Sequence, residues 1–302
     1  IINEMLDAYN NINFKDINGN TALHLFVKKI QKENFDLLKK LLLKKISINH
    51  TNNYGQNALH IAVENNNIDV TKILLDNGIN VNVQTINDHL TPMLIGTIHN
   101  NIQICELLIN YEPNFNNQDI YGNSVLCHAI MNKSKQMIRL YYDKVDVNLV
   151  NISGQIAINL FFDNGYDLNS LNEFYFDKIL ESSILNSQNN QGKTTWHYLV
   201  DNDVWEKYYD ILITKRNKIF IQDLDGLTPY SIIKTKYSKK MPKFMDLIAN
   251  SFYNNIKSIE SKLKQTQKNE FDFIFKDTKT NSIEQLKNII ENKNISVPDG
   301  KK

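Results

Sequence analysis

The feature that most constrains how this chain can fold is an internal repeat with a period of about 34 residues. A short motif recurs seven times, most clearly as GNTALHLF, GQNALHIA and GKTTWHYL. The second position after its glycine is occupied by Thr21, Asn57, Thr91, Ser124, Ile156, Thr194 and Thr228, at intervals of 36, 34, 33, 32, 38 and 34 residues. Spacing this regular predicts a stack of similar units, each covering the apolar face of its neighbour.

Each unit combines the motif with a second amphipathic segment. In the second unit, Val70, Ile73 and Leu74 fall at i, i+3 and i+4, which places them on one face of a helix. Segments that alternate apolar residues with asparagine, such as INVNVQ, connect one unit to the next. We therefore expect a turn, a short first helix, a loop, a longer second helix and an extended return to the next turn.

The repeat resembles the ankyrin repeat family, whose signature T-P-L-H-x-A recurs about every 33 residues. The segments TPMLIG and LTPYSI keep the Thr-Pro pair, and NALHIA keeps Leu-His-x-Ala. The resemblance covers about Asn13 to Tyr253. It implies an all-α solenoid of helix-turn-helix units, with β-hairpin fingers and a concave binding face. Each finger needs a positive φ, which suits the motif's glycine, as in Gly55.

The repeat divides the chain into three expected parts. Residues 1–14 resemble the second half of a partial repeat, and residues 15–253 form an array of about seven repeats. Residues 254–302 read as a linker followed by a strand and a helix, either a cap or the start of another domain. Because the chain begins inside a repeat, we expect it to be a segment of a larger protein.

Three histidines, His24, His60 and His197, occupy the same position of the motif. A catalytic or metal-binding histidine is placed once, opposite a specific partner, whereas these are placed by the repeat. The resemblance implies a structural role in which each ring bonds backbone groups that join adjacent repeats. The remaining histidines are expected to be solvated or to lie in the fingers.

No motif for catalysis is present in the chain. It contains no H-x-x-x-H pair, no G-x-S-x-G, and no glycine-rich phosphate loop. Cys105 and Cys127 lie in apolar helical segments and are expected to be buried structural thiols. We therefore expect no enzymatic activity, no metal, no cofactor and no small-molecule substrate.

Composition narrows the partners and the compartment. The net charge is +1 and the chain contains two arginines, so nothing favours nucleic-acid binding. No apolar run reaches 18 residues, so no membrane span is expected. Two cysteines do not form a disulfide framework, which favours an intracellular location, cytoplasmic or nuclear. The abundant asparagine is attributed to an AT-rich genome.

A rigid surface without catalytic groups predicts a scaffold or adaptor that binds a protein or peptide. The residues expected to contact it surround the finger glycines or end the first helices, where stacking does not need the side chain. They are Asn53, Tyr54, Gln56, Glu64, Asn65, Asn87, His89, Tyr121, Asn123, Met131, Asn132, Asp163 and Asp201. The two tyrosines either anchor a partner or pack on the next finger. Three acidic residues among these positions hint at a basic partner.

Several alternatives remain open at this stage. The chain is either a binding scaffold or the regulatory or substrate-recruiting arm of a larger enzyme or membrane-traffic regulator. The fifth repeat, GQIAINLF, lacks threonine and histidine and is either a bend or a contact site. The lysine-rich segment KTKYSKKMPKF is either a solvated loop or a site for a phospholipid or an acidic partner.

Overall fold

A computed structural model describes residues 13–29, 34–44, 46–166, 173–209, 211, 219–246 and 248–249. The chain divides into two compact units, Ile1–Tyr198 and Leu199–Lys302, which are considered separately below. The predicted partial repeat at 1–14 lies almost entirely outside the described residues. The predicted extension at 254–302 lies wholly outside them.

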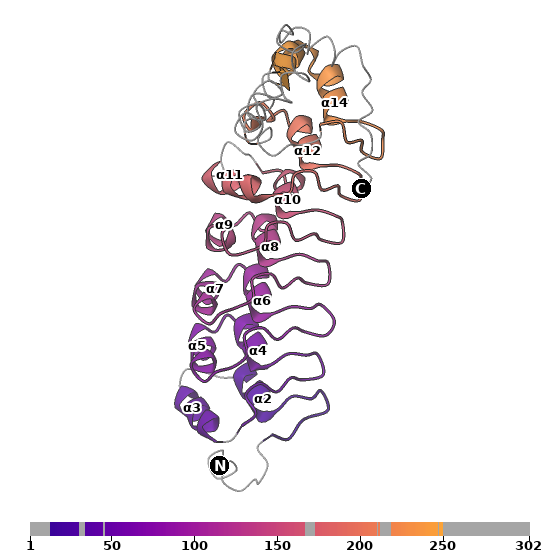
Figure 1. Cartoon of the computed structure of the whole chain (residues 1–302). Helices are drawn as coiled ribbons and strands as arrows, with labels where there is room; N and C mark the ends of the chain where they lie inside the picture. The colour runs from indigo at the N-terminus through magenta and orange to yellow at the C-terminus, as the bar shows by residue number, and fades with distance from the viewer. Residues whose placement is uncertain are drawn as a thin grey trace, which may run out of the picture. The chain divides into compact units, whose positions relative to one another are not determined.

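The first unit consists of two columns of helices with loops that project from one side (Figure 1). The column next to the loops holds the first helices, α2 (Ala22–Lys29), α4 (Ala58–Glu64), α6 (Pro92–Ile98), α8 (Val125–Met131) and α10 (Ala157–Asp163). The other column holds the second helices, α3 (Phe35–Leu43), α5 (Ile68–Asp76), α7 (Ile102–Ile109), α9 (Lys135–Tyr141) and α11 (Glu173–Ser182). Successive first helices contact one another, as the repeat predicts.

The first helices begin directly after the second position of the motif, and in α4 and α6 that position holds a capping side chain. Thr91 accepts a hydrogen bond from the backbone of Leu94 at 3.2 Å, and Pro92 occupies the first turn of α6. Asn57 caps α4 through its side chain in the same way. Leu59, one residue into α4, is fully buried between adjacent repeats. The motif therefore sets both where a helix begins and which side chain enters the core.

The projecting loops are tight hairpin fingers. The second finger is closed by a backbone hydrogen bond of 2.9 Å from Asn52 to Gln56 and turns at Gly55, where φ is +77°. Equivalent bonds close the first, third, fourth, fifth and sixth fingers, at 16–20, 85–90, 119–123, 151–155 and 189–193. Among the described residues the only strand-like pairing is one isolated bridge, between Lys15 and Thr21. The hairpins are thus turns rather than extended ribbons.

Neighbouring fingers are joined by the backbone. The amide of Ile86 donates to the carbonyl of Tyr54 at 2.9 Å, and the amide of Ile152 donates to that of Tyr121 at 2.9 Å. A Cβ added at Gly55 would lie 2.9 Å from the amide nitrogen of Ile86. Glycine is therefore required here both for the positive φ and for the close approach of the next finger.

The alternating segments form a ladder of asparagine side chains that joins repeat to repeat. In each step, a side-chain oxygen accepts a hydrogen bond from a backbone amide of the next repeat. The steps are Asn49 to Asn80 at 2.6 Å, Asn82 to Asn114 at 2.7 Å, Asn116 to Asp146 at 2.8 Å and Asn148 to Ile184 at 2.6 Å. Asparagine in these segments thus has a structural role beyond any genomic bias.

The fifth repeat replaces the missing histidine with Asn159. The side-chain oxygen of Asn159 accepts from the amide of Ile156 at 3.2 Å, and its nitrogen lies 3.4 Å from the hydroxyl of Thr195 in the sixth motif. Asn159 therefore links two repeats, as a histidine does at this position. The stack continues through the fifth repeat, and α11 packs against α10.

The helix α12 (Thr195–Asp201) crosses the boundary between the two units, and the second unit also contains α14 (Pro229–Lys236) and a short 3₁₀ helix, η2 (Ser238–Lys240). Thr228 caps α14, and Trp205 packs edge-on against Phe244.

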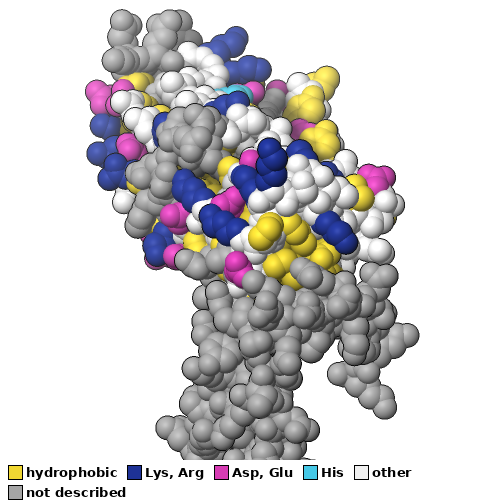
Figure 2. Space-filling view, turned by 90° about the horizontal axis from the view of Figure 1, so that it is seen from above, with side chains coloured by type: hydrophobic (Ala, Val, Ile, Leu, Met, Phe, Trp, Pro, Cys, Tyr) yellow, Lys and Arg dark blue, Asp and Glu magenta, His cyan; other side chains and the backbone are white. Residues whose placement is uncertain are grey.

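Three of the five lysines in the lysine-rich segment have partners within the second unit. Lys240 binds Asp203 at 2.7 Å, Lys243 binds Glu206 at 2.5 Å, and Lys236 donates to the carbonyl of Asp201 at 3.0 Å. Figure 2, viewed from above, shows basic side chains next to acidic ones rather than a separate basic patch. Two of the five lysines thus pair with carboxylates, which favours the solvated loop over a phospholipid site.

Candidate partner-binding surface

The repeated histidines are buried joints between repeats. The Nδ1 atom of His60 accepts from the amide of Asn57 at 3.2 Å, and its Nε2 atom lies 3.1 Å from the carbonyl oxygen of Leu90 in the next repeat. His24 reaches the carbonyl of Gln56 in the same way, at 2.9 Å. Burial lowers the pKa of His60 from its ordinary 6.5 to about 4, so the ring is neutral at physiological pH. The structural role that the resemblance implied is confirmed.

Both cysteines are buried and reduced, as predicted. Burial raises the pKa of each thiol, which disfavours the reactive thiolate form. Within the described part of the chain, no three side chains of histidine, cysteine, aspartate or glutamate are grouped to hold a metal ion. In the same part of the chain, no helix has both the length and the apolar character needed to cross a bilayer.

A row of apolar side chains lies at the tips of fingers two to five. This fingertip row comprises Tyr54, Ile86, Ile120, Tyr121 and Ile152, and between 47% and 63% of each side chain is exposed. The next finger does not bury Tyr54 or Tyr121, which remain 53% and 60% exposed. Because the fingers are joined by backbone hydrogen bonds, the row is one continuous feature of the first unit.

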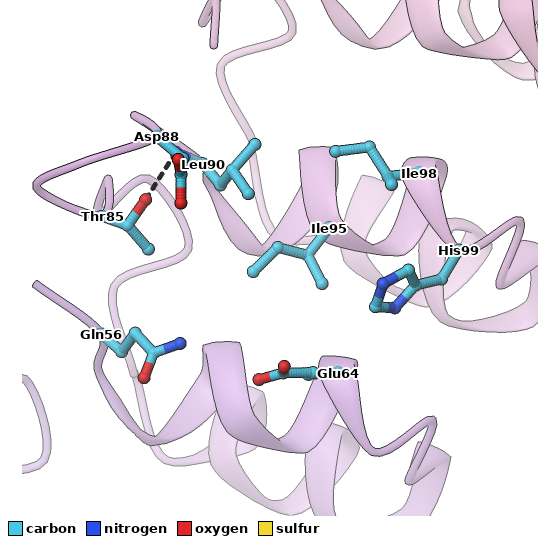
Figure 3. A pocket seen from close by; sticks show the side chains of 8 residues that line it. All are labelled: Gln56, Glu64, Thr85, Asp88, Leu90, Ile95, Ile98 and His99. Atoms are coloured by element: carbon cyan, nitrogen blue, oxygen red, sulfur yellow. Dashed lines mark hydrogen bonds between the residues drawn. The ribbon is translucent and has the colours of Figure 1, made fainter. Parts of the chain in front are cut away.

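A pocket of about 180 Å³ lies between the second and third repeats (Figure 3). Leu90, Ile95 and Ile98 supply its apolar part. Gln56 and Glu64 face it from the second repeat, and Thr85, Asp88 and His99 face it from the third. We call this the concave pocket, because the fingers and first helices together form the concave face.

The third finger is one residue longer than its neighbours. Its closing hydrogen bond runs from the amide of Thr85 to the carbonyl of Leu90, which adds one residue to the span found in the second finger. His89 stands where other fingers have glycine and adopts a φ of +54°. Consequently Asn87 and His89 are exposed at the finger tip, and Asp88 lines the pocket.

The assumption that stacking makes no use of the predicted side chains is wrong for three asparagines and for Asp163, which is described below. The side-chain amide of Asn53 donates to the carbonyl of Ile17 in the preceding finger at 3.1 Å. Asn132 donates to the carbonyl of Thr97 in the preceding repeat at 2.8 Å. The side-chain oxygen of Asn123 accepts a hydrogen bond from Asn151 of the next finger at 3.2 Å. The position of an asparagine in the motif does not show that its side-chain amide can contact the neighbouring repeat.

The other predicted residues keep exposed or half-exposed side chains. Asn65 is exposed at the end of α4, and Met131 is half-buried at the end of α8. Asp163 is exposed but held in place by Gln155 and by the hydroxyl of Tyr198 at 3.3 Å. Asp201 lies in the second unit and is therefore considered apart from the others.

Several residues of this surface were not among those predicted. Leu90, Ile95, Ile98 and His99 line the pocket, and Ile86 and Ile152 belong to the fingertip row. Aligning the first helices by their shared histidine position would have placed Ile95 and Ile98 beside Ile61 and Glu64 of the previous repeat. The motif alone does not indicate them, because apolar residues in a helix are normally interpreted as core residues.

The fold and this surface define a class of protein, a solenoid of helix-turn-helix repeats with one continuous face of fingers and first helices. Residues 1–85 match the family model described as ankyrin repeats (3 copies). An ankyrin repeat protein of Acanthamoeba polyphaga mimivirus is 27% identical over 99% of this chain, which spans 42% of that relative's length. A Fowlpox virus ankyrin repeat protein is 33% identical over 32% of this chain and 29% of its own length.

The structural comparison agrees with this class. The crystal structure of the ankyrin repeat domain of Bcl-3 matches with a TM-score of 0.55 at 17% identity, covering 71% of this chain and 94% of that one. At that identity the match shows the fold alone. Together with the sequence matches, it supports an ankyrin repeat family protein.

Proposed function

We propose that this chain is a non-catalytic interaction module that binds a partner protein or peptide with its fingers and first helices. The fingertip row carries this proposal. Exposed apolar side chains scattered singly are ordinary, but a continuous row on linked fingers marks an interaction site. Tyr54 and Tyr121 combine a large apolar ring with a polar hydroxyl, which is typical of the residues that dominate binding energy.

The concave pocket supports the same proposal. It lies beside the third finger, so one extended ligand could contact the finger tips and the pocket together. The buried, neutral histidines and the buried thiols leave this surface without a reactive group that points to catalysis. Buried reduced thiols are also consistent with the intracellular, cytoplasmic location that we propose.

A second proposal is that the chain acts as the recruiting or regulatory arm of a longer protein. The observation that favours it is the length of the mimivirus relative, of which this chain spans 42%. Under this proposal the surface binds its partner in the same way, and another part of the longer protein acts on that partner.

Affinity capture from the cells that express the chain tests the first proposal. The wild-type chain and a Tyr54→Ala, Tyr121→Ala double variant are compared as bait, with captured proteins identified by mass spectrometry. We expect the double variant to lose the specific partner, with an affinity at least about tenfold lower in a calorimetric titration, because both rings are interface anchors.

The control is Leu43→Ala, which removes an apolar side chain that is 84% exposed at the end of α3, away from the fingers. It should bind as the wild type does. All three proteins should give the same far-ultraviolet circular dichroism. Equal affinity of the double variant and the wild type would refute the assignment of the fingertip row.

A further inference from the structure

The concave face of repeats two to five carries charge of one sign. The first helices α4, α6, α8 and α10 and the second to fifth fingers contain no lysine and no arginine. The same segments contain four carboxylates, Glu64, Asp88, Asp119 and Asp163. The chain as a whole has a net charge of +1, so the acidity belongs to this face and not to the composition.

The carboxylates are not equivalent. Asp119 is 5% exposed and binds His128 at 2.8 Å, so its charge already has a partner. Asp163 is held by Tyr198 and Gln155 near the far end of the face. Glu64 and Asp88 are exposed, come from different repeats, and line the same pocket. Two carboxylates at one pocket create a local negative potential that favours a cation.

The rest of the pocket is apolar. Leu90, Ile95 and Ile98 line it, and Ile95 is 6% exposed, so its side chain is held in the packed repeat. The volume of about 180 Å³ is smaller than the roughly 300–1,000 Å³ of sites for drug-sized ligands. A pocket of this size suits a single side chain of a larger partner.

A pocket with an apolar wall and a negatively charged rim is complementary to a side chain that has an apolar stem and a cationic end. Lysine and arginine bury an aliphatic stem along apolar surface and keep a charged end in a polar environment. The first basic residue along the chain after α6 is Lys133, which lies over the ring of Tyr166 at 5.9 Å rather than in the pocket. His99 also lines the pocket, and the test below is carried out at one fixed pH, pH 8.

We infer that the concave pocket accepts a lysine or arginine side chain of the partner. The aliphatic stem lies against Leu90, Ile95 and Ile98, and the charged end lies between Glu64 and Asp88. The inference rests on the proposed function and adds the chemistry of the occupant. The partner segment is a basic peptide or loop that lies along the fingers and inserts its cationic side chain toward the first helices.

Selection from a displayed library of random twelve-residue peptides tests this inference. Peptides are selected on the wild-type chain at pH 8, and the tightest one is synthesised with its basic residue intact or replaced by norleucine. We expect selected sequences to share a lysine or arginine, and the replacement to weaken binding about tenfold. Replacing lysine by arginine in the same peptide shows which cation the pocket prefers.

The Glu64→Gln, Asp88→Asn double variant removes both charges with little change of shape. It should bind the basic peptide about tenfold more weakly than the wild type and show a smaller dependence on salt. Glu106→Gln is the matched control, because Glu106 is an exposed carboxylate on the second helix α7. It should leave the affinity unchanged, and all variants should unfold at the same temperature.

The two proposals fail in different ways. Recovered peptides without a shared basic residue, bound equally by the wild type and the double variant, would overturn this inference and leave the interaction module standing. A selection that enriches no peptide on the wild-type chain would count against both.

Discussion

At the scale of single residues, His60 shows how a reactive side chain becomes a structural one. Its ring is buried between repeats and spans from the amide of Asn57 to the carbonyl of Leu90. Protonation would place a charge in this buried junction. The low pKa therefore follows mainly from burial, and the repeat gains stability only while the ring stays neutral.

The pH dependence follows from the direction of this shift. The pKa of His60 is lower in the folded chain, about 4, than its ordinary 6.5, so the unfolded chain binds the proton first. Its contribution to the free energy of unfolding is complete above about pH 7 and is lost as the pH falls from 6.5 through 4. The full loss is about 3 kcal/mol. Urea denaturation at several pH values measures it.

His60→Asn is the matched variant, because Asn159 already occupies this position in the fifth repeat, where it bonds the amide of Ile156 and the hydroxyl of Thr195. We expect the variant to be less stable than the wild type at pH 7.5, with a difference that shrinks toward pH 4.5. A difference that stays constant over this range would contradict the assignment of the titration to His60.

At the scale of elements, much of this fold follows from the sequence because each motif residue has one local task. Glycine turns the finger, threonine or asparagine caps the first helix, and leucine enters the core. The longer third finger was not predictable from the motif, because His89 adopts a positive φ without being glycine. The sequence did not predict the pocket: Gln56 and Glu64, which line it, were expected only to contact a partner, and its walls come from apolar residues that are typical of a core.

The asparagine ladder is an element that can be tested by removing one step. Asn82→Ala deletes the acceptor for the amide of Asn114 and leaves that amide without its partner. We expect a loss of about 1–2 kcal/mol in the free energy of unfolding, measured by urea denaturation. Asn87→Ala, at the exposed tip of the third finger, should change stability by less than about 0.5 kcal/mol. Equal effects of the two substitutions would show that the ladder contributes nothing specific.

At the scale of the whole molecule, contacts run between neighbours, and stability should therefore be shared locally. In the first unit α8 contacts α6, α9 and α10, its immediate neighbours in the stack. A destabilising substitution in one repeat weakens the interfaces of that repeat with its two neighbours. It affects more distant repeats only through those interfaces. The molecule should therefore open in segments rather than respond uniformly.

Leu126→Ala tests this behaviour, because Leu126 is fully buried in α8. The substitution should cost about 2–5 kcal/mol. Hydrogen exchange followed by mass spectrometry should show the largest loss of protection in α8 and α9, a smaller loss in α6 and α10, and the least in α3. A uniform loss across all helices of the first unit would instead indicate a single cooperative block.

The asparagine ladder also determines how the protein responds to deamidation over time. Asparagine slowly loses its amide nitrogen to become aspartate, and this chain depends on many asparagines. Asp146 occupies the position that Asn80 and Asn114 occupy in earlier repeats. In all three, the side-chain oxygen accepts a hydrogen bond from the backbone amide two residues later, so this position requires only an oxygen. Asn148 also donates its amide nitrogen, to Ser182 at 3.2 Å. Conversion at Asn80 or Asn114 would thus keep the local bond, whereas conversion at Asn148 would break one, so damage over time should concentrate where the amide donates.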